Sequence, residues 1–499
     1  MNNIRVKIKK GFLWAGFGAF AGRGLQFISD IILSRLLFPE DFGLMAIGLS
    51  VLNISEMLTE TGFSSALIQK QGDIKKYLNT TWTMEVIKSI ILFLFVFLIA
   101  KPISIFYDEP SVLGVLRGIS FLFLLRGFRN VGVVFFRKNL EIHKQVILDI
   151  IPSIFQLLLV IPMAYYLQSV WAIILSVYVR RFTELVLSFL MHTHKPRFEF
   201  HTDNFKELIH FGKWIIGLSI IGAVRKNFVP LFIGKYFDIE TLGYFNRAEL
   251  LSILFFSVLT EIVWKVGYPV MSQFQYDYKR LKKFYLDLFF TIIYLGIPIS
   301  ICIIIFSEDI VLNIFSVKWL ASVFMLKILV LAGLISFTGT LSSMAMQAIG
   351  KPKVSAKISL YSIILLLITI FPFSNYGGIV GLIISLIISR FYSVIHSLLM
   401  VMKFIGIKKI DILRPIKFSL FNSIVFIIPI ITLKLYLFNN INMLTLIFFI
   451  IYGTIIFILL AIFWNKVFTF NLINTLSPLF NKQQNIRLHT KSRVELKNE

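Results

Sequence analysis

The chain has 499 residues, of which 57% are hydrophobic, and its formal net charge is +24. A nucleic-acid-binding protein could be this basic, but it needs a charged surface, and only 15% of these residues are charged. The mean hydropathy of +0.83 indicates many lipid-facing helices and argues against soluble enzymes, disordered chains and secreted disulfide scaffolds. Cys302 is the single cysteine, so no intramolecular disulfide can form.

Long apolar runs follow one another along the whole chain. About 20 apolar residues are needed to cross roughly 30 Å of hydrocarbon. Runs of that length predict an all-α polytopic membrane protein with fourteen transmembrane helices. The predicted spans are 11–36, 41–68, 77–100, 111–136, 145–167, 169–191, 207–233, 241–270, 284–306, 319–347, 354–373, 376–402, 415–437 and 443–464.

The charges between the spans predict the orientation in the membrane. Thirty-one basic residues lie in or directly beside the N-terminal head, alternate connections and the C-terminal tail, whereas the other connections hold only Lys101, Lys235 and Lys318. Because Lys and Arg collect on the cytoplasmic side, this asymmetry predicts that both termini are cytoplasmic. The outward connections, such as FPED and FSNYGG, are too short to house an active site.

An internal repeat divides the predicted spans. Four positions recur at an offset of 200, which predicts two pseudo-symmetric six-helix lobes, related by an axis along the membrane normal, followed by two further helices. The predicted parts are an N-lobe at 11–191, a cytoplasmic linker at 192–206, a C-lobe at 207–403, two C-terminal helices within 404–464 and a basic cytoplasmic tail at 465–499. The matching positions are Trp14 with Trp214, Arg35 with Lys235, Glu40 with Glu240 and Gly43 with Gly243.

Basic residues outnumber acidic residues within the spans. A mid-span cation facing lipid costs about 2.5 to 3.5 kcal/mol, so a surplus of cations indicates a water-filled cavity that receives an anion. Arginine suits phosphate because its planar guanidinium binds pairs of oxygens and keeps its charge. The candidate diphosphate-binding residues are Arg23, Arg126, Arg129, Arg225, Lys226, Arg247 and Arg390.

Other intramembrane charges have a simpler explanation. Some basic residues have acidic neighbours three or four positions away on one helical face, which predicts structural pairs: Lys88 with Glu85, Arg180 and Arg181 with Glu184, and Lys265 with Glu261. Lys213, Lys265 and Lys434 lie close enough to span ends to extend to the interface. The candidates for ion coupling are Asp30, which alternatively pairs with Arg23, and Glu60, Asp149 and Glu249.

Six segments along the chain carry a family resemblance: LSRLLFPEDFGLMAIGLSVLNISEMLTETGFSSALIQK, PRFEF, LGYFNRAELL, YPVMSQFQ, IFSVKW and AIGKP. They resemble bacterial polysaccharide repeat-unit flippases, the Wzx-like polysaccharide transport family of the multidrug/oligosaccharidyl-lipid/polysaccharide exporter superfamily. The resemblance covers roughly residues 5–405. It implies a fold like those of the multidrug exporters and lipid II flippases of that superfamily. It also implies that Arg247 lines the cavity and that Arg23 lies where lipid II flippases use arginine.

The resemblance implies a transporter and no enzyme. Such a flippase moves an undecaprenyl-diphosphate-linked oligosaccharide across the bacterial cytoplasmic membrane by alternating access. Its expected partners are the lipid-linked oligosaccharide, membrane lipids, a polymerase and other polysaccharide-assembly proteins, with no nucleic acid. The sequence shows no nucleotide-binding or metalloprotease motif, and we expect no cofactor and no metal. The alternatives are a cation-coupled multidrug antiporter, which would prefer acidic cavity residues, and a membrane polysaccharide polymerase, which would need a larger outward loop.

Overall fold

The computed structural model describes residues 2–59, 63, 67, 74–139, 141–202, 222–437 and 442–467, and within these ranges the regular structure is helical. The chain divides into two compact units, Met1–Asn246 and Arg247–Glu499. The predicted span at 207–233 is therefore described only from residue 222, and the predicted tail only up to residue 467. The division into lobes at 11–191 and 207–403 stays a prediction.

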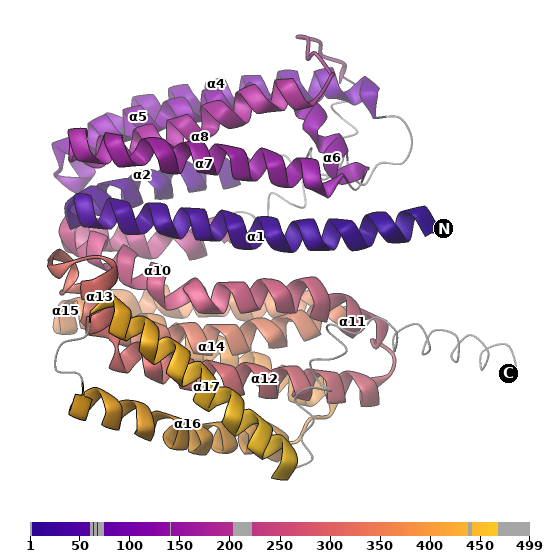
Figure 1. Ribbon diagram of the computed structural model, residues 1–499. Helices are drawn as coiled ribbons and strands as arrows, with labels where there is room; N and C mark the ends of the chain where they lie inside the picture. Colours follow the sequence, from indigo (N-terminus) through magenta and orange to yellow (C-terminus); the bar gives the residue numbers. More distant parts are fainter. Residues whose placement is uncertain are drawn as a thin grey trace, which may run out of the picture. The chain divides into compact units, whose positions relative to one another are not determined.

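The first unit is a bundle of long helices (Figure 1). In it α4 packs on α5, α7 on α8 and α1, and α5 on α2 and α8. A further helix covers residues 222–236, and the unit ends within α10. The helices are α1 (Asn2–Leu36), α2 (Pro39–Leu58), α4 (Lys75–Tyr107), α5 (Pro110–Gly127), η1 (Val131–Val133), α6 (Val134–Lys138), α7 (Ile142–Leu167), α8 (Val170–Met191) and α10 (Ile239–Ile262).

Local chemistry explains where α5 begins and ends. Pro110 occupies the first helical position, where its missing N–H costs nothing, and the Glu109 carboxylate accepts the Ser111 backbone N–H at 3.1 Å. The predicted span at 111–136 is divided in the structure, because α5 ends at Gly127 and Asn130 begins a new element. Its side chain accepts the Gly132 N–H at 2.8 Å and thereby caps η1.

Residues 192–201, the first part of the predicted linker, have no helix and lie against α4. The Thr83 hydroxyl donates to the Glu199 carbonyl at 3.1 Å and accepts the Glu199 N–H at 3.0 Å. Asn79 donates to the Glu199 carboxylate at 2.6 Å, and Thr80 accepts the His201 N–H at 3.2 Å. The bonds from Asn79 and His201 lower the pKa of Glu199. We call residues 192–201 the strap.

Thr83→Val is expected to loosen the strap. The substitution keeps the shape of the side chain and removes both hydrogen bonds to Glu199, each of which contributes about 0.5–1.5 kcal/mol. We expect roughly tenfold faster amide hydrogen exchange in residues 192–201, measured by mass spectrometry. The control is Thr81→Val, because the buried Thr81 hydroxyl has no hydrogen-bond partner among the described residues. Equal rates of amide hydrogen exchange in the two variants would contradict the role of Thr83 in holding the strap.

The second unit is also helical in its described residues (Figure 1). In it α14 packs on α15 and α12, and α16 packs on α12 and α17. Lys434, predicted to extend to the interface, forms an ion pair with Asp309 at 2.5 Å. Beyond α10 the elements are the π-helical turn η2 (Val263–Gly267), α11 (Tyr268–Gln273), α12 (Tyr278–Ile305), α13 (Ser307–Ile314), η3 (Val317–Trp319), α14 (Ser322–Ala348), α15 (Pro352–Ile405), α16 (Lys409–Leu437) and α17 (Met443–Val467).

The element α15 consists of two helices that meet at Gly378. This residue has φ 55° and ψ −142°, a conformation that side chains other than glycine rarely adopt. The two helices run back along one another, since the Ser389 hydroxyl donates to the Ser362 carbonyl at 2.6 Å and the Ser385 hydroxyl to the Thr369 carbonyl at 3.1 Å. The turn agrees with the predicted break between the spans 354–373 and 376–402.

Seven helices within the described ranges are long and apolar enough to cross a membrane, and α15 is one of them. The chain is thus an all-helical, multi-pass membrane protein. The number of fourteen spans stays a prediction. Charged residues such as Arg23, Asp30 and Arg35 interrupt the apolar character of α1.

Candidate functional site

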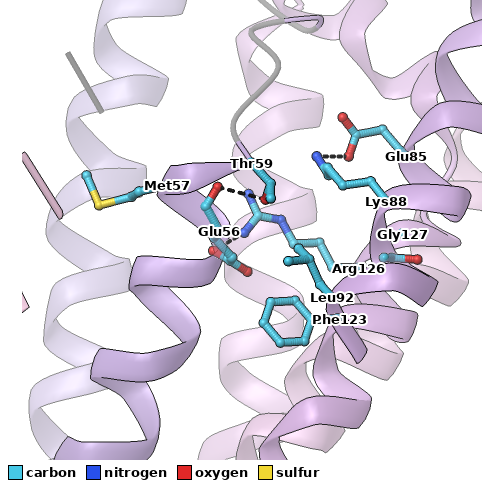
Figure 2. A pocket seen from close by; sticks show the side chains of 10 residues that line it. Glu56, Met57, Thr59, Glu85, Lys88, Leu92, Phe123, Arg126 and Gly127 are labelled. Atoms are coloured by element: carbon cyan, nitrogen blue, oxygen red, sulfur yellow. Dashed lines mark hydrogen bonds and ion pairs between the residues drawn. The ribbon is translucent and has the colours of Figure 1, made fainter. Parts of the chain in front are cut away.

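A cluster of charged residues joins three helices of the first unit. Arg126, in the last turn of α5, forms an ion pair with Glu56 near the end of α2 (Figure 2). On α4, Lys88 pairs with Glu85, as their helical spacing predicted. Figure 2 shows the Arg126 guanidinium directed at Glu56, with the pair of Lys88 and Glu85 on the adjoining helix.

The two ion pairs border a cavity of about 140 Å³. The Glu56 side chain is 22% exposed and the Arg126 side chain 53% exposed, so the guanidinium is accessible to solvent while its partner is mostly covered. A guanidinium held in this way keeps donors available for a further anion. The lining residues are Glu56, Met57, Thr59, Glu85, Lys88, Ser89, Leu92, Phe123, Arg126 and Gly127.

A second cavity, of about 150 Å³, lies on another side of Arg126. Here Glu184 of α8 binds two arginines, with Arg129 at 2.6 Å and Arg181 at 3.1 Å. The pair of Arg181 and Glu184 follows the predicted spacing. The Nε atom of Arg129 is buried and has no hydrogen-bond partner among the described residues.

Arg126 lines both cavities. We call the charged residues that line either cavity the arginine cluster: Lys88, Arg126, Arg129 and Arg181 with Glu56, Glu85 and Glu184. Four basic side chains face three carboxylates, so the cluster carries a surplus of one positive charge. Guanidinium groups bind phosphate oxygens in pairs. The arrangement is suited to an anion with several oxygens.

Residues of α1 and α7 lie near this cluster. Arg180 of α8 donates to the Gln26 side-chain oxygen at 3.5 Å, and Gln26 donates to Asp30 at 3.4 Å. Asp30 is buried, with 8% of its surface exposed, whereas Asp149 on α7 is exposed and accepts hydrogen bonds from Gln145. Arg23 is half-buried on α1. Pairing of Arg23 with Asp30 stays a prediction.

The structure places Arg225 and Lys226 on the helix at 222–236, where both side chains are exposed. They directly precede the buried Asn227, whose side-chain oxygen accepts a hydrogen bond from Asn53 of α2 at 3.4 Å. Because an amide pair carries no charge pattern, this contact could not be predicted from the sequence. Both cations lie on the same turn of helix and are accessible to solvent.

The remaining candidates belong to the second unit. Arg247 is buried, with 6% of its surface exposed. The Arg390 guanidinium of α15 lies 3.9 Å from the carboxylate of Glu249 on α10. One candidate anion ligand and one candidate coupling residue thus form an ion pair. Glu60 lies outside the described residues, as do Lys213 and the side chains of Glu261 and Lys265.

His192 and His194 of the strap make structural contacts. His192 stacks on Phe135, and its Nδ1 accepts the backbone N–H of His194 at 3.0 Å. Burial lowers the pKa of both imidazoles, which favours the neutral form that this acceptor role requires. In the part of the chain that the structure describes, no group of three or more His, Cys, Asp or Glu side chains has the arrangement of a metal site.

Comparison with known proteins identifies the family. The sequence profile described as "Polysaccharide biosynthesis protein" matches residues 32–324, more than half of the chain. The chain belongs to this family.

Relatives within the family carry related names. The chain is 20% identical over 403 residues to the lipopolysaccharide biosynthesis protein WzxC of Escherichia coli strain K12, covering 80% of this chain and 82% of that protein. It is 19% identical over 337 residues to the teichuronic acid biosynthesis protein TuaB of Bacillus subtilis strain 168, covering 67% and 70%. These names confirm the resemblance to Wzx-like proteins.

Solved structures show the same fold. The lipid II flippase MurJ in an inward closed conformation matches with a TM-score of 0.70 and 17% identity, over 91% of this chain and 99% of that one. An inward-facing multidrug resistance MATE family transporter of the MOP superfamily matches with a TM-score of 0.61 and 15% identity, over 77% and 94%. At these sequence identities the structural likeness establishes the fold of this chain. The substrate has to be argued from the chemistry of the site.

Proposed function

We propose that the protein is a flippase for undecaprenyl-diphosphate-linked oligosaccharide repeat units. It moves them from the inner to the outer leaflet of the bacterial cytoplasmic membrane for surface polysaccharide synthesis, including exopolysaccharide, capsule or O-antigen. The observation that carries the proposal is the arginine cluster, in which four basic side chains, three of them arginines, face three carboxylates within a helical membrane unit. A diphosphate crossing the bilayer needs such a path, because its charges are costly in hydrocarbon.

Further support comes from relatives and from the loop charges. The related proteins are named for lipopolysaccharide and teichuronic acid biosynthesis, and MurJ for flipping lipid II. The positive connections favour an inner-membrane orientation with both termini in the cytoplasm. Transport proceeds by alternating access of two lobes, 11–191 and 207–403, with membrane lipids, a polymerase and other assembly proteins as partners. The proposal includes no cofactor, and Asp30, Glu60, Asp149 and Glu249 remain the candidate coupling residues.

Reconstitution tests the proposal directly. Proteoliposomes would contain the purified protein and a polyprenyl-diphosphate-linked oligosaccharide with a fluorophore on the sugar. A quencher that does not cross the membrane then quenches the fluorescence of only the lipid in the outer leaflet. We expect the protein to carry the inner-leaflet pool outward, so that quenching exceeds that of empty vesicles.

The control substrate is the same labelled sugar on a lipid without the diphosphate. It should move poorly, because the arginine cluster then has no anion to bind. Failure to move either lipid, together with exchange of a cationic dye against protons or Na⁺, would replace the flippase by the multidrug antiporter.

A further inference from the structure

Three aromatic rings meet where the strap crosses α4. The ring centroid of Trp82 on α4 lies 4.8 Å from that of Phe198 on the strap. It lies 6.3 Å from that of Phe128, the residue that directly follows α5. The indole N–H of Trp82 also donates to the Phe128 carbonyl at 3.4 Å, which holds the indole against this end of α5. We call the rings of Trp82, Phe128 and Phe198 the aromatic platform.

The rings of the platform differ in how far they are covered. Trp82 is only 7% exposed, whereas Phe128 is 37% exposed and Phe198 is 69% exposed. The buried indole thus supports two phenylalanine rings that remain accessible. A single exposed ring is common on protein surfaces, so the neighbours of the platform decide what it can bind.

Planar polar side chains border the platform. The Glu199 carboxylate accepts a hydrogen bond from Asn79 at 2.6 Å and lies 2.7 Å from Nε2 of His201. Asn79 and Trp82 are three residues apart on α4 and therefore share one face of the helix. The side chains of Glu199 and His201 are 46% and 55% exposed, so both can make further hydrogen bonds. An apolar ring surface and hydrogen-bonding groups therefore lie side by side.

The platform also adjoins the arginine cluster. Phe128 lies between Arg126 and Arg129 in the chain. On α4, Glu85 of the cluster follows Trp82 by three residues, which places it on the same face, about 5 Å further along the axis at 1.5 Å per residue. Because α4 begins on the side that the loop charges predict to be cytoplasmic, the platform lies on the cytoplasmic side of the cluster.

The charge of this surface favours an uncharged ligand. The hydrogen bonds from Asn79 and His201 lower the pKa of Glu199, so its carboxylate is ionised at neutral pH. An ionised carboxylate repels a phosphate, which the arginines of the neighbouring cluster attract. A pyranose ring suits the platform, because it combines an apolar face of C–H groups with hydroxyl groups around its edge. The C–H groups are attracted to the negative face of an aromatic ring.

We propose that the aromatic platform, together with Asn79, Glu199 and His201, binds the sugar residue next to the diphosphate when a lipid-linked oligosaccharide enters from the cytoplasmic side. The ring of Phe198 packs on the face of the sugar, and the polar side chains bind its hydroxyl groups. The inference rests on the proposed flippase function, of which it names the part that recognises sugar. A diphosphate held by the arginine cluster brings its first sugar to this surface.

Two lipids separate recognition of the sugar from recognition of the diphosphate. One is undecaprenyl diphosphate, and the other is the same lipid linked to glucose, whose ring hydroxyls lie around its edge. Their dissociation constants are measured by native mass spectrometry of the purified full-length protein. Phe198→Leu keeps an apolar side chain but removes the aromatic face. We expect it to weaken binding of the glucose-bearing lipid, relative to the bare lipid, about tenfold.

Three further variants complete this experiment. Phe198→Trp keeps an aromatic face and should preserve the preference for the glucose-bearing lipid. Arg126→Ala should weaken binding of both lipids, because both carry the diphosphate. The control is Phe189→Leu, which removes an exposed phenylalanine near the end of α8, outside the platform.

The outcomes distinguish the platform from the flippase function. An equal loss for both lipids in Phe198→Leu would show that the ring only holds the strap or rests on the membrane, and would overturn the inference. An unchanged ratio of the two dissociation constants would overturn it as well. In both cases, weaker binding of the two lipids to Arg126→Ala would leave the flippase proposal standing. If neither lipid binds the unsubstituted protein, both proposals fail.

Hydrogen exchange provides a measurement that needs no substitution. We expect the glucose-bearing lipid to slow amide hydrogen exchange in the strap about tenfold more than the bare lipid does, because only the sugar contacts this segment. The start of α7, which lies outside the platform, is the internal control. Equal exchange rates in the strap with the two lipids would contradict the inference.

Discussion

Arg126→Ala is expected to abolish surface polysaccharide while the protein still inserts into the membrane. The substitution removes a solvent-accessible guanidinium that lines both cavities of the arginine cluster. A hydrogen bond between charged groups contributes about 1.5–3 kcal/mol, so we expect roughly 10- to 100-fold slower movement of the lipid. The measurement is polymer on intact cells, normalised to protein in the membrane fraction.

Arg23→Ala and Arg247→Ala are expected to act in the same direction. The control is Arg117→Ala on the same helix as Arg126, because Arg117 is exposed and lies over the Phe97 ring, 4.8 Å from its centroid, away from both cavities. It removes the same charge without touching the cluster. Normal polymer from all three test variants would rule out a cationic path for the diphosphate.

The ion pair with Glu56 offers a second explanation of an Arg126 defect, namely a buried carboxylate left without its partner. The double substitution Arg126→Ala with Glu56→Ala distinguishes these two explanations. If Arg126 only neutralises Glu56, the double variant regains transport. If Arg126 binds substrate, the double variant stays inactive, whereas Arg126→Lys restores part of the rate because it keeps the charge. We expect the second pattern.

Gly378→Ala is expected to destabilise the second unit. The backbone at Gly378, with φ 55° and ψ −142°, lies where an alanine side chain is strained. Such a residue costs about 1–3 kcal/mol. Gly381→Ala should act likewise, because a Cβ there would collide with the carbonyl oxygen of Phe373. We expect the monodisperse fraction of both variants to disappear at a lower temperature than that of the unsubstituted protein. The measurement is size-exclusion chromatography after heating in detergent.

The adjoining Gly377 provides a matched control. A Cβ at this position meets nothing within 4 Å, and its φ is not positive. Gly377→Ala should therefore leave the melting behaviour unchanged or raise it slightly, since alanine lowers the entropy of the unfolded chain. Equal melting of Gly377→Ala and Gly378→Ala would contradict the role assigned to the turn.

Hydropathy predicted the apolar cores of the helices better than their ends. The predicted first span begins at residue 11, but α1 begins at Asn2, because charged residues continue a helix outside an apolar run. The predicted third span stops at residue 100, whereas α4 continues to Tyr107 and ends at Asp108, whose φ is 54°. A helix ends where its backbone turns, and hydropathy does not report that position.

Contacts within one helix were predictable, and contacts between helices were not. The pairs of Lys88 with Glu85 and of Arg181 with Glu184 follow from their spacing of three residues. The partner of Arg126 comes from α2 and that of Arg129 from α8, so both depend on how α5 packs. The sequence contains each charge, but only the fold decides which charges meet.

The turns that precede α2 and α10 meet in a reciprocal contact: a Cβ atom on Gly43 would collide with the Ile239 carbonyl oxygen, and a Cβ atom on Gly243 with that of Pro39. This contact has the form of an interface between identical subunits. In a two-fold symmetric dimer, a residue of one copy touches a second residue of the other copy, and the reverse contact is made as well. Gly43 with Ile239 and Gly243 with Pro39 follow this rule at an offset of 200. Two matching turns, both within the first unit, therefore meet here as they would in a fused homodimer. A larger side chain at either glycine would collide with the backbone of the other turn, so neither glycine can be replaced without displacing both turns.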